Sequence, residues 1–339
     1  MQMAVRGTIV GTIALALVAT NAPAIAWQVA PVRAADQPVA TVSVDPALGE
    51  ASISRMTISR SRLTLPVRID DKQWFDFVVD TGAERTLIST EAAAELMLAA
   101  EGPLRLATIT GAVVAPSFFI ERLDMGAIDR EGVIAPALSR HDMGIDGLIG
   151  IDSLADHSVV FDFKNRRLEV RRSAKRPVRL TTAEEIVVIG ARRQAGRLIL
   201  SGARINGRRI DVVVDTGAQG SIGNLALQRL VDRRGRRTQP TELIGVSGDS
   251  ITGQAGSIAK IEFDGMTLVD APVAYADTYA LRALGLHDKP ALLLGMDALT
   301  LFDRVEIDFA RRRVSFTMPR QSARPSPLRL AVRASLLDR

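Results

Sequence analysis

Two stretches of the chain share almost the same alternation of apolar and polar positions. Residues 75–89 read FDFVVDTGAERTLIS and residues 210–224 read IDVVVDTGAQGSIGN, so equivalent positions lie 135 residues apart. In the first stretch, a period of two places Phe75 and Phe77 on one face of a strand and Asp80 on the other. Each stretch therefore predicts a β-strand that ends on an aspartate. A sharp turn follows at a glycine, which has the backbone freedom to make it.

The similarity extends over two halves of the chain. Arg62 precedes the first aspartate by 18 residues, and Arg197 precedes the second by the same interval. Each half then continues in the same order, with a glycine-centred turn between apolar runs, an apolar strand that ends on Gly150 or Gly295, and a strand–turn–strand. Internal similarity of this extent predicts a duplicated structural unit.

The predicted fold class is mainly β. Short runs rich in Val, Ile, Phe and Thr alternate with glycines and charged turns in both halves. The best helix candidates are the short segments at residues 91–98 and 224–231. The expected organisation after the N-terminal segment is a lead-in, a first lobe, a linker, a second lobe and a basic tail, at residues 27–60, 61–172, 173–195, 196–318 and 319–339.

The N-terminal segment, residues 1–26, has the pattern of a secretory signal peptide. Arg6 is followed by an apolar stretch at residues 8–20, and then by small residues that suit an A-x-A cleavage site after Ala24 or Ala26. The apolar stretch is too short for a comfortable membrane span, so no stable span is expected once the signal is cleaved. We therefore expect export to a bacterial periplasm, with an uncleaved N-terminal anchor as the alternative.

Composition narrows the chemistry open to the two lobes. The chain has no cysteine and only three histidines, so thiol nucleophiles are excluded and no metal or other cofactor is expected. The net charge of +5 comes with basic clusters at residues 166–179 and 229–237. Aromatic residues make up only 4% of the chain and do not interleave these charges, so the clusters are interpreted as solvated turns and no nucleic-acid partner is expected.

The two aspartates at the strand ends are the candidate catalytic residues. A single Asp-Thr-Gly is typical of a plain β-turn. Two copies, at residues 80–83 and 215–218, each follow Val-Val and precede alanine within the same longer pattern, which turns alone do not explain. With this paired motif the chain resembles the aspartic proteases over roughly residues 61–318. The alanine is closer to the retroviral type, whereas two halves in one chain are typical of pepsin-like enzymes.

This resemblance implies two acid-protease-like β-barrel lobes related by a pseudo-two-fold axis, with Asp80 and Asp215 facing each other. Two adjacent carboxylates do not both ionise at low cost, so the pair shares one proton. The ionised member would accept a proton from a water that attacks the peptide carbonyl, while the protonated member donates a hydrogen bond to the carbonyl oxygen. Because the pair is pseudo-symmetric, the sequence assigns the base role to neither aspartate.

The resemblance also implies roles for the residues around the aspartates. In the two active-site turns the threonine hydroxyls would cross-link the lobes, the glycines would let the backbone approach the water, and the alanines would offer no hydroxyl to the carboxylates: Thr81, Gly82, Ala83, Thr216, Gly217 and Ala218. The turns around Gly111 and Gly248 would be flaps that close over an extended peptide. Neither flap contains tyrosine, and Glu84 and Gln219 also depart from the retroviral pattern.

Two further recurring features are interpreted as structural. The pairs His141–Asp142 and His287–Asp288 precede the apolar–glycine strands, but no serine elbow motif accompanies them, so they are predicted to be loop residues. Asp152 and Asp297 follow the glycines of those strands and are predicted to cap helices.

The predicted function is that of an exported aspartic endopeptidase that hydrolyses peptide bonds in extended, partly apolar polypeptide segments. The alternative is a non-catalytic peptide-binding module that has kept the protease fold. The presence of both Asp80 and Asp215 favours catalysis, because a retired site would be free to lose either one. The assembly is expected to be a monomeric pseudo-dimer or a homodimer with exchanged lobes.

Overall fold

The structure is a computed structural model that describes residues 16–19, 51–55, 57–59, 62–126, 128–173, 186–194, 196–232, 238–319 and 330–331. The cleavage sites predicted after Ala24 and Ala26, and most of the predicted lead-in and basic tail, lie outside the described residues. Among the residues that are described, no helix is long and apolar enough to cross a membrane.

The first lobe is built on an eight-stranded sheet. Six of its strands, in the order β4, β5, β10, β6, β9 and β8, form a closed ring, because β8 also pairs with β4. The eight strands are β3 (Thr57–Ser59), β4 (Arg62–Ile69), β5 (Gln73–Val79), β6 (Leu87–Ser89), β7 (Ala99–Ala107), β8 (Ala112–Asp124), β9 (Asp129–Leu138) and β10 (Gly147–Ile149). Three short helices accompany them: α1 (Thr90–Glu95), α2 (Arg140–Met143) and α3 (Ile151–Leu154).

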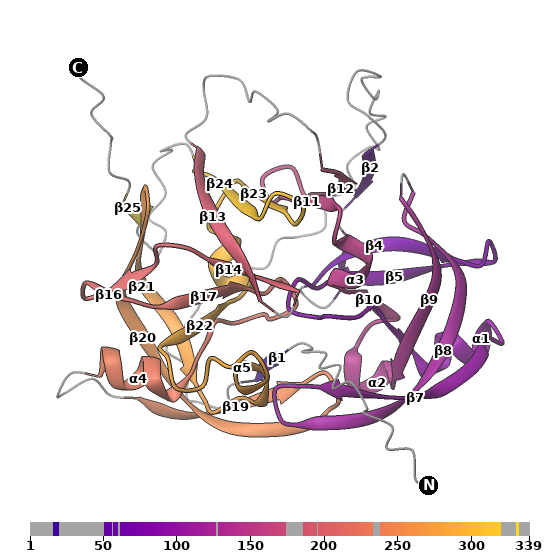
Figure 1. Cartoon of the computed structure of the whole chain (residues 1–339), viewed down its shortest axis with the longest axis horizontal. Helices are drawn as coiled ribbons and strands as arrows, with labels where there is room; N and C mark the ends of the chain where they lie inside the picture. Colours follow the sequence, from indigo (N-terminus) through magenta and orange to yellow (C-terminus); the bar gives the residue numbers. More distant parts are fainter. Residues whose placement is uncertain are drawn as a thin grey trace, which may run out of the picture.

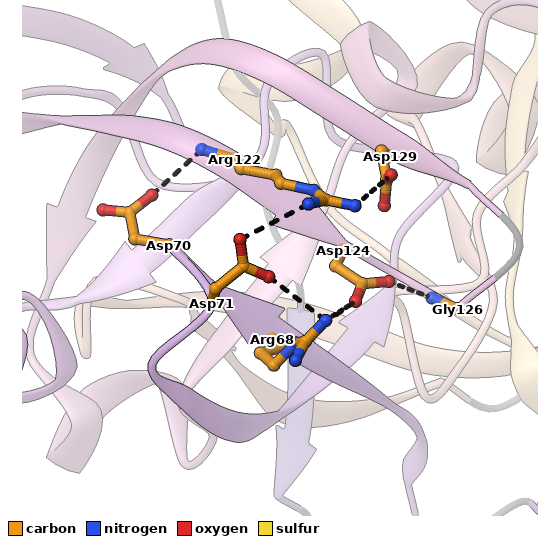
Figure 2. Close-up of polar contacts among 7 residues, drawn as sticks. All are labelled: Arg68, Asp70, Asp71, Arg122, Asp124, Gly126 and Asp129. Carbon is orange, nitrogen blue, oxygen red and sulfur yellow. Dashed lines mark hydrogen bonds and ion pairs between the residues drawn. The ribbon is translucent and has the colours of Figure 1, made fainter.

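A charge network spans the pairing of β4 with β8 that closes this ring (Figure 2). Arg68 and Asp124 are cross-strand partners, and the guanidinium Nη2 lies 2.8 Å from the carboxylate Oδ2. Arg122 Nη2 lies 2.6 Å from Asp129 Oδ2. The Gly126 N–H and Arg68 lower the pKa of Asp124 against the upward effect of burial. Partly exposed pairs of this kind contribute about 1 kcal/mol or less each, so the network assists the strand pairing without dominating it.

The second lobe repeats the strand pairing of the first. β14 pairs with β17, β17 runs parallel to β22, β22 pairs with β18, and β18 runs parallel to β21, in the order seen for β4, β5, β10, β6 and β9. Its strands are β14 (Arg197–Leu200), β15 (Arg204–Ile205), β16 (Arg208–Arg209), β17 (Asp211–Val214), β18 (Ile222–Gly223), β19 (Gln239–Gly245), β20 (Ser250–Phe263), β21 (Met266–Tyr275) and β22 (Ala291–Leu294). Its helices are α4 (Leu225–Val231), α5 (Tyr279–Ala283) and α6 (Met296–Leu299).

A six-stranded antiparallel sheet joins the lobes at one end of the molecule (Figure 1). Its strands, in spatial order, are β2 (Ala51–Arg55), β12 (Arg167–Arg172), β11 (His157–Asp162), β23 (Arg304–Asp308), β24 (Arg313–Thr317) and β13 (Ile186–Gln194). The β11–β23 pairing connects the two halves, and Arg171 Nη2 donates to Glu306 Oε1 across it at 2.6 Å. The strand β13 lies within the segment predicted to link the lobes.

Two long hairpins, β7–β8 and β19–β20, lie at the end of the molecule opposite the joining sheet (Figure 1). A short strand from the predicted signal segment, β1 (Ala16–Ala19), pairs antiparallel with β19. The strand β25 (Leu330–Ala331) pairs with β21. Apart from these additions, the sequence prediction of a mainly β chain with two similar lobes is confirmed.

The helices begin where the sequence provides caps. The Ser89 hydroxyl accepts from Ala92 N at the start of α1, and the Asn224 side chain accepts from Leu227 N at the start of α4. The first helix ends earlier than predicted, because Met97 adopts φ +52°, which a helix does not allow. The predicted segment at residues 224–231 agrees with α4.

One apolar core extends through both lobes and the joining sheet. The phenylalanines packed in it come from both halves and are almost fully buried: Phe77, Phe161, Phe302, Phe309 and Phe316. Burial of each such side chain contributes about 1.5–3 kcal/mol. The two lobes therefore form one packed unit, which holds the two predicted active-site turns at a fixed separation.

Candidate active site

Each predicted catalytic aspartate lies directly after a strand that is paired on both sides. Asp80 follows β5, and its N–H donates to Ile149 O at 3.0 Å, at the end of the parallel strand β10. Asp215 follows β17, and its N–H donates to Leu294 O at 3.0 Å, at the end of β22. The two apolar–glycine strands found in the sequence are therefore β10 and β22, and their last carbonyls fix the backbone position of each aspartate.

The turn after each aspartate folds back onto its own carboxylate. Asp80 Oδ1 accepts from the N–H groups of Gly82 and Ala83 at 2.7 and 3.0 Å. Asp215 Oδ1 accepts from the N–H groups of Gly217 and Ala218 at 3.0 and 3.1 Å. These donors hold Oδ1 of each carboxylate, so Oδ2 is the oxygen that its own turn leaves without a backbone donor.

The two carboxyl groups lie together between the lobes. A Cβ added to Gly82 of the first lobe would lie 2.4 Å from Asp215 Oδ1, and one added to Gly217 of the second lobe would lie 2.3 Å from the Asp80 carboxyl carbon. Asp80 is 0% exposed and Asp215 is 3% exposed. Only glycine leaves room for this approach, and the structure brings both predicted aspartates to one buried point.

The predicted threonines lock the two turns to each other. The Thr81 N–H donates to Thr216 Oγ1 at 3.0 Å, and the Thr216 N–H donates to Thr81 Oγ1 at 3.1 Å. Each hydroxyl then donates to a carbonyl of the opposite lobe, Val214 O at 2.8 Å and Val79 O at 2.7 Å. All four bonds cross between the lobes and each involves a threonine hydroxyl, so the two threonines fix the separation of the turns.

Burial and mutual proximity make the dyad hard to ionise. Burial raises the pKa of Asp80 well above its usual value, and the neighbouring charge of Asp215 raises it further. Burial also raises the pKa of Asp215, against the lowering effect of its backbone donors, of Arg197 and of a hydrogen bond with Asp80. The pair is thus suited to hold one proton under conditions in which isolated aspartates hold none.

A second pair of carboxylates braces the turns from behind, and its role differs from the prediction. Asp152 Oδ1 accepts from Thr86 Oγ1 at 2.8 Å, and Asp297 Oδ1 accepts from Ser221 Oγ at 2.7 Å. The N-cap positions of α3 and α6 are instead the preceding glycines. The N-cap position is therefore wrong for these aspartates, although Asp152 Oδ1 and Asp297 Oδ1 do accept from the first-turn N–H groups of Ser153 and Ala298 at 2.8 Å. Their carboxylates also reach back across the lobe to a hydroxyl six residues after each predicted catalytic aspartate. That equal offset is a signal the sequence already contained.

The turns predicted as flaps are the tips of the two long hairpins. Gly111 closes the β7–β8 turn, where Thr108 N–H donates to Gly111 O at 2.7 Å. Gly248 lies in the β19–β20 turn with φ +81°. The tips meet, since a Cβ on Gly245 would lie 3.2 Å from Ile109 Cγ1.

Each flap tip packs into the lobe opposite its own. Ile109 of the first-lobe flap belongs to an apolar cluster made largely of second-lobe residues, and its carbonyl accepts from Tyr279 N at 2.9 Å. Val246 of the second-lobe flap packs with Val78 and Ala83 of the first lobe. Ile109 and Val246 are each 2% exposed, whereas Gly248 and Asp249 of the second turn are exposed. Each predicted flap therefore contacts the opposite lobe through one buried apolar residue, and this exchange was not predicted from the sequence.

The histidine–aspartate pairs lie at the surface. The side chains of His141 and His287 are 93% and 52% exposed, and each ring contacts the adjacent aspartate. His141 is in helix α2 rather than in the predicted loop. Asp142 lies beside the second flap tip, because a Cβ on Gly248 would come within 2.7 Å of Asp142 Oδ1. Neither histidine is among the groups that shift the pKa of the dyad.

Arg197 is a site residue that the sequence reading did not single out. It begins β14 in the second lobe, is 2% exposed, and is the largest of the fully buried side chains among the described residues. Its Nε donates to Gly82 O in the first-lobe turn at 2.8 Å. A buried cation beside two carboxyl groups is an unusual feature, since burying an arginine is unfavourable unless hydrogen bonds and opposite charge offset the loss of water.

Comparison with known protein families agrees with this geometry. A family model described as aspartyl protease matches the chain at residues 65–153 and 201–298, which together make up more than half of its length. Each matched region contains one Asp-Thr-Gly-Ala motif and its supporting strand. A search among curated proteins returned no match.

Proposed function

This chain belongs to the aspartyl protease family, and from that premise we propose that it is an aspartic endopeptidase with Asp80 and Asp215 as its catalytic residues. It hydrolyses peptide bonds with a water activated between the two carboxyl groups, without a covalent intermediate. Its substrates are extended, partly apolar segments of polypeptide.

One observation carries this proposal: two buried carboxyl groups, one from each lobe, are packed against the same pair of glycine turns. Their Oδ1 atoms are held by backbone N–H groups, which leaves the Oδ2 atoms for water and substrate. Burial raises the pKa of both groups, and the charge of Asp215 raises that of Asp80 as well. A shared proton then supplies one acid and one base in a single site.

The flaps suit a substrate that binds as an added strand. The second-lobe flap strand β19 already accepts an extended piece of this chain, Ala16–Ala19, in antiparallel register. Main-chain pairing of this type gives affinity without demanding a particular sequence, and side-chain contacts then select among substrates. Ile109 and Val246 at the flap tips are apolar, which favours apolar residues beside the cleaved bond. Because Ile109 and Val246 are buried against the opposite lobes, the flaps open to admit a peptide.

The decisive experiment compares cleavage of a peptide library by four proteins, with the products identified by mass spectrometry. Wild type and Asp288→Asn, which changes an exposed aspartate, are expected to cleave the same bonds. Asp80→Asn and Asp215→Asn are expected to lose at least about 100-fold in rate. Unchanged cleavage in either dyad variant contradicts the mechanism. Binding of library peptides by the wild type without any cleavage supports a peptide-binding module instead.

We also propose that the protein is exported, on the basis of the signal-like pattern of residues 1–26. N-terminal sequencing of the protein recovered from a periplasmic fraction is expected to begin at Ile25 or Trp27. A full-length protein that stays in the membrane fraction points to an uncleaved anchor.

A further inference from the structure

The buried guanidinium of Arg197 connects the two halves of the site. From β14 of the second lobe, its Nε donates to the Gly82 carbonyl of the first-lobe turn at 2.8 Å. That same turn is packed on Asp215, since a Cβ on Gly82 would lie 2.4–2.7 Å from three atoms of the Asp215 carboxyl group. Arg197 therefore holds the piece of backbone against which Asp215 rests.

Three carboxyl groups face this guanidinium. The strongest electrostatic interaction is with Glu84, the next with Asp215 and the third with Asp80. Burial lowers the pKa of Arg197, and the three acids oppose that effect. Glu84 in turn faces Arg85 and Asp152. This order agrees with the geometry, because the Gly82 turn that Arg197 holds packs against Asp215.

The second-lobe turn has a different residue at the matching position. Gln219 follows the motif where Glu84 does in the first lobe, and an amide carries no charge. The residue that matches Arg197 in the repeat is Arg62, whose side chain lies outside those that the structure describes. Whatever Arg62 contacts, the acid that neutralises the cation in the first-lobe turn has no counterpart in the second.

The two aspartates also differ in what surrounds them. Asp80 is 0% exposed, and its Oδ2 is buried without a hydrogen-bond donor among the described residues. An ionised oxygen in that position is strongly unfavourable, whereas a protonated one can donate to the neighbouring carboxylate. Asp215 is slightly exposed, and the Gly82 turn that Arg197 holds packs against its carboxyl group.

We infer that Arg197 is a positioning residue that breaks the pseudo-symmetry of the dyad, so that the shared proton stays on Asp80 and Asp215 is the base that activates water. This assignment rests on the proposed function, and it refines it by giving each aspartate a separate role. Arg197 acts through Gly82 and through its field on Asp215, and it does not touch the substrate.

The sign of its effect follows from electrostatics. A nearby cation favours the ionised form of a carboxylate, so loss of Arg197 raises the pKa of Asp215 and brings the two aspartates closer to equivalence. Neutralising Glu84 has the opposite sign, because Glu84 offsets part of the field that Arg197 exerts on the dyad.

The test is a nuclear magnetic resonance titration of the full-length protein with ¹³C-labelled aspartate side chains. Asp80→Asn and Asp215→Asn assign the two signals. In the wild type at the pH where the dyad holds one proton, we expect the Asp80 carbon to show the protonated shift and the Asp215 carbon the ionised shift. In Arg197→Met, we expect the Asp215 titration to move upward by about one pH unit, and in Glu84→Gln to move downward by less.

Arg171→Met is the matched control, because it removes another cross-lobe arginine, one paired with Glu306 in the joining sheet. It is expected to lower stability while leaving the dyad titration unchanged. If Arg197→Met does not fold, Arg197→Lys and Glu84→Gln carry the test: the lysine variant keeps the charge and is expected to titrate near the wild type.

An Asp215 titration that is the same in wild type, in Glu84→Gln and in folded Arg197→Met overturns the inference, as does a proton found on Asp215 in the wild type. The titration needs no substrate, so its outcome is independent of whether peptides are cleaved. If cleavage is observed, the acidic limb of its pH–rate profile is expected to move upward in Arg197→Met alongside the Asp215 signal.

Discussion

The two lobes are alike where they face each other and differ where they face outward. At the pseudo-axis the residues are identical, from the aspartates to the alanines, and the hydrogen bonds of one turn are matched in the other within a few tenths of an ångström. One position further along, Glu84 is replaced by Gln219. The two Asp-Thr-Gly-Ala turns must have the same sequence because each packs against the other. The residues that follow them contact different neighbours in the two lobes, so they can differ.

The flap turns show the same contrast. In the first flap the Thr108 hydroxyl bonds within its own turn, to Thr110 Oγ1 at 2.8 Å and to Gly111 O at 3.0 Å. In the second flap, Gly248 provides a left-handed residue and Ser247 donates to Asp249 at 3.1 Å. Two different turn chemistries thus bring two apolar tips to equivalent places, which indicates that tip position is constrained and turn sequence is not.

The largest expected effect comes from filling the close approach at the centre. Gly82→Ala and Gly217→Ala each place a methyl group within 2.4 Å of the opposite carboxyl group, which must then move. A displacement of about 1 Å in a reacting group costs roughly 100-fold in rate, and we expect at least this loss of peptide cleavage in both variants. If one variant keeps wild-type turnover, the two turns are not equivalent parts of one site. Gly202→Ala, where a Cβ meets nothing within 4 Å, is the control. Its φ of +81° is expected to cause a small loss of stability through backbone strain without loss of cleavage.

The braces behind the turns are expected to matter for stability in both lobes. Asp152→Ala removes the carboxylate that accepts from the N–H and the hydroxyl of buried Thr86, and Asp297→Ala does the same to Ser221. We expect each to lower the free energy of unfolding by about 1–3 kcal/mol, measured by urea denaturation. The matched asparagine variants keep an acceptor oxygen and are expected to lose less. If only one of the two alanine variants loses stability, the two carboxylates do not have equivalent roles in the two lobes.

A smaller effect with a definite pH dependence is expected from the dyad itself. Burial raises the folded-state pKa of Asp80 above its unfolded value, so its contribution to stability is fully present at low pH and is lost as the pH rises through the folded pKa. Asp80→Asn is therefore expected to be more stable than the wild type near neutral pH, by about 1.4 kcal/mol per unit of pKa elevation, and equally stable at low pH. Denaturation curves with a pH-independent difference contradict the raised pKa.

Much of the site was predictable because the same motif occurs in both halves of the chain. The aspartates, their turns and the flap glycines recur at similar offsets, and the family match confirms the resemblance. The roles of Arg197 and Asp152 were not predicted, because the partner of each lies far along the chain, 115 residues away for Gly82 and 66 for Thr86. Ile109 and Val246 each pack into the opposite lobe, and this packing depends on how the two lobes dock. The sequence pattern around each residue does not encode that docking.

The central claim is that Asp80 and Asp215 of one chain build one catalytic site, and the most direct test mixes two inactive variants. Asp80→Asn and Asp215→Asn are unfolded together, refolded in equal amounts and assayed for peptide cleavage beside each variant alone and the wild type treated in the same way. We predict that the mixture stays as inactive as either variant, while the wild type recovers its activity. Cleavage restored in the mixture would show that the aspartates come from different chains with exchanged lobes, and would contradict the account.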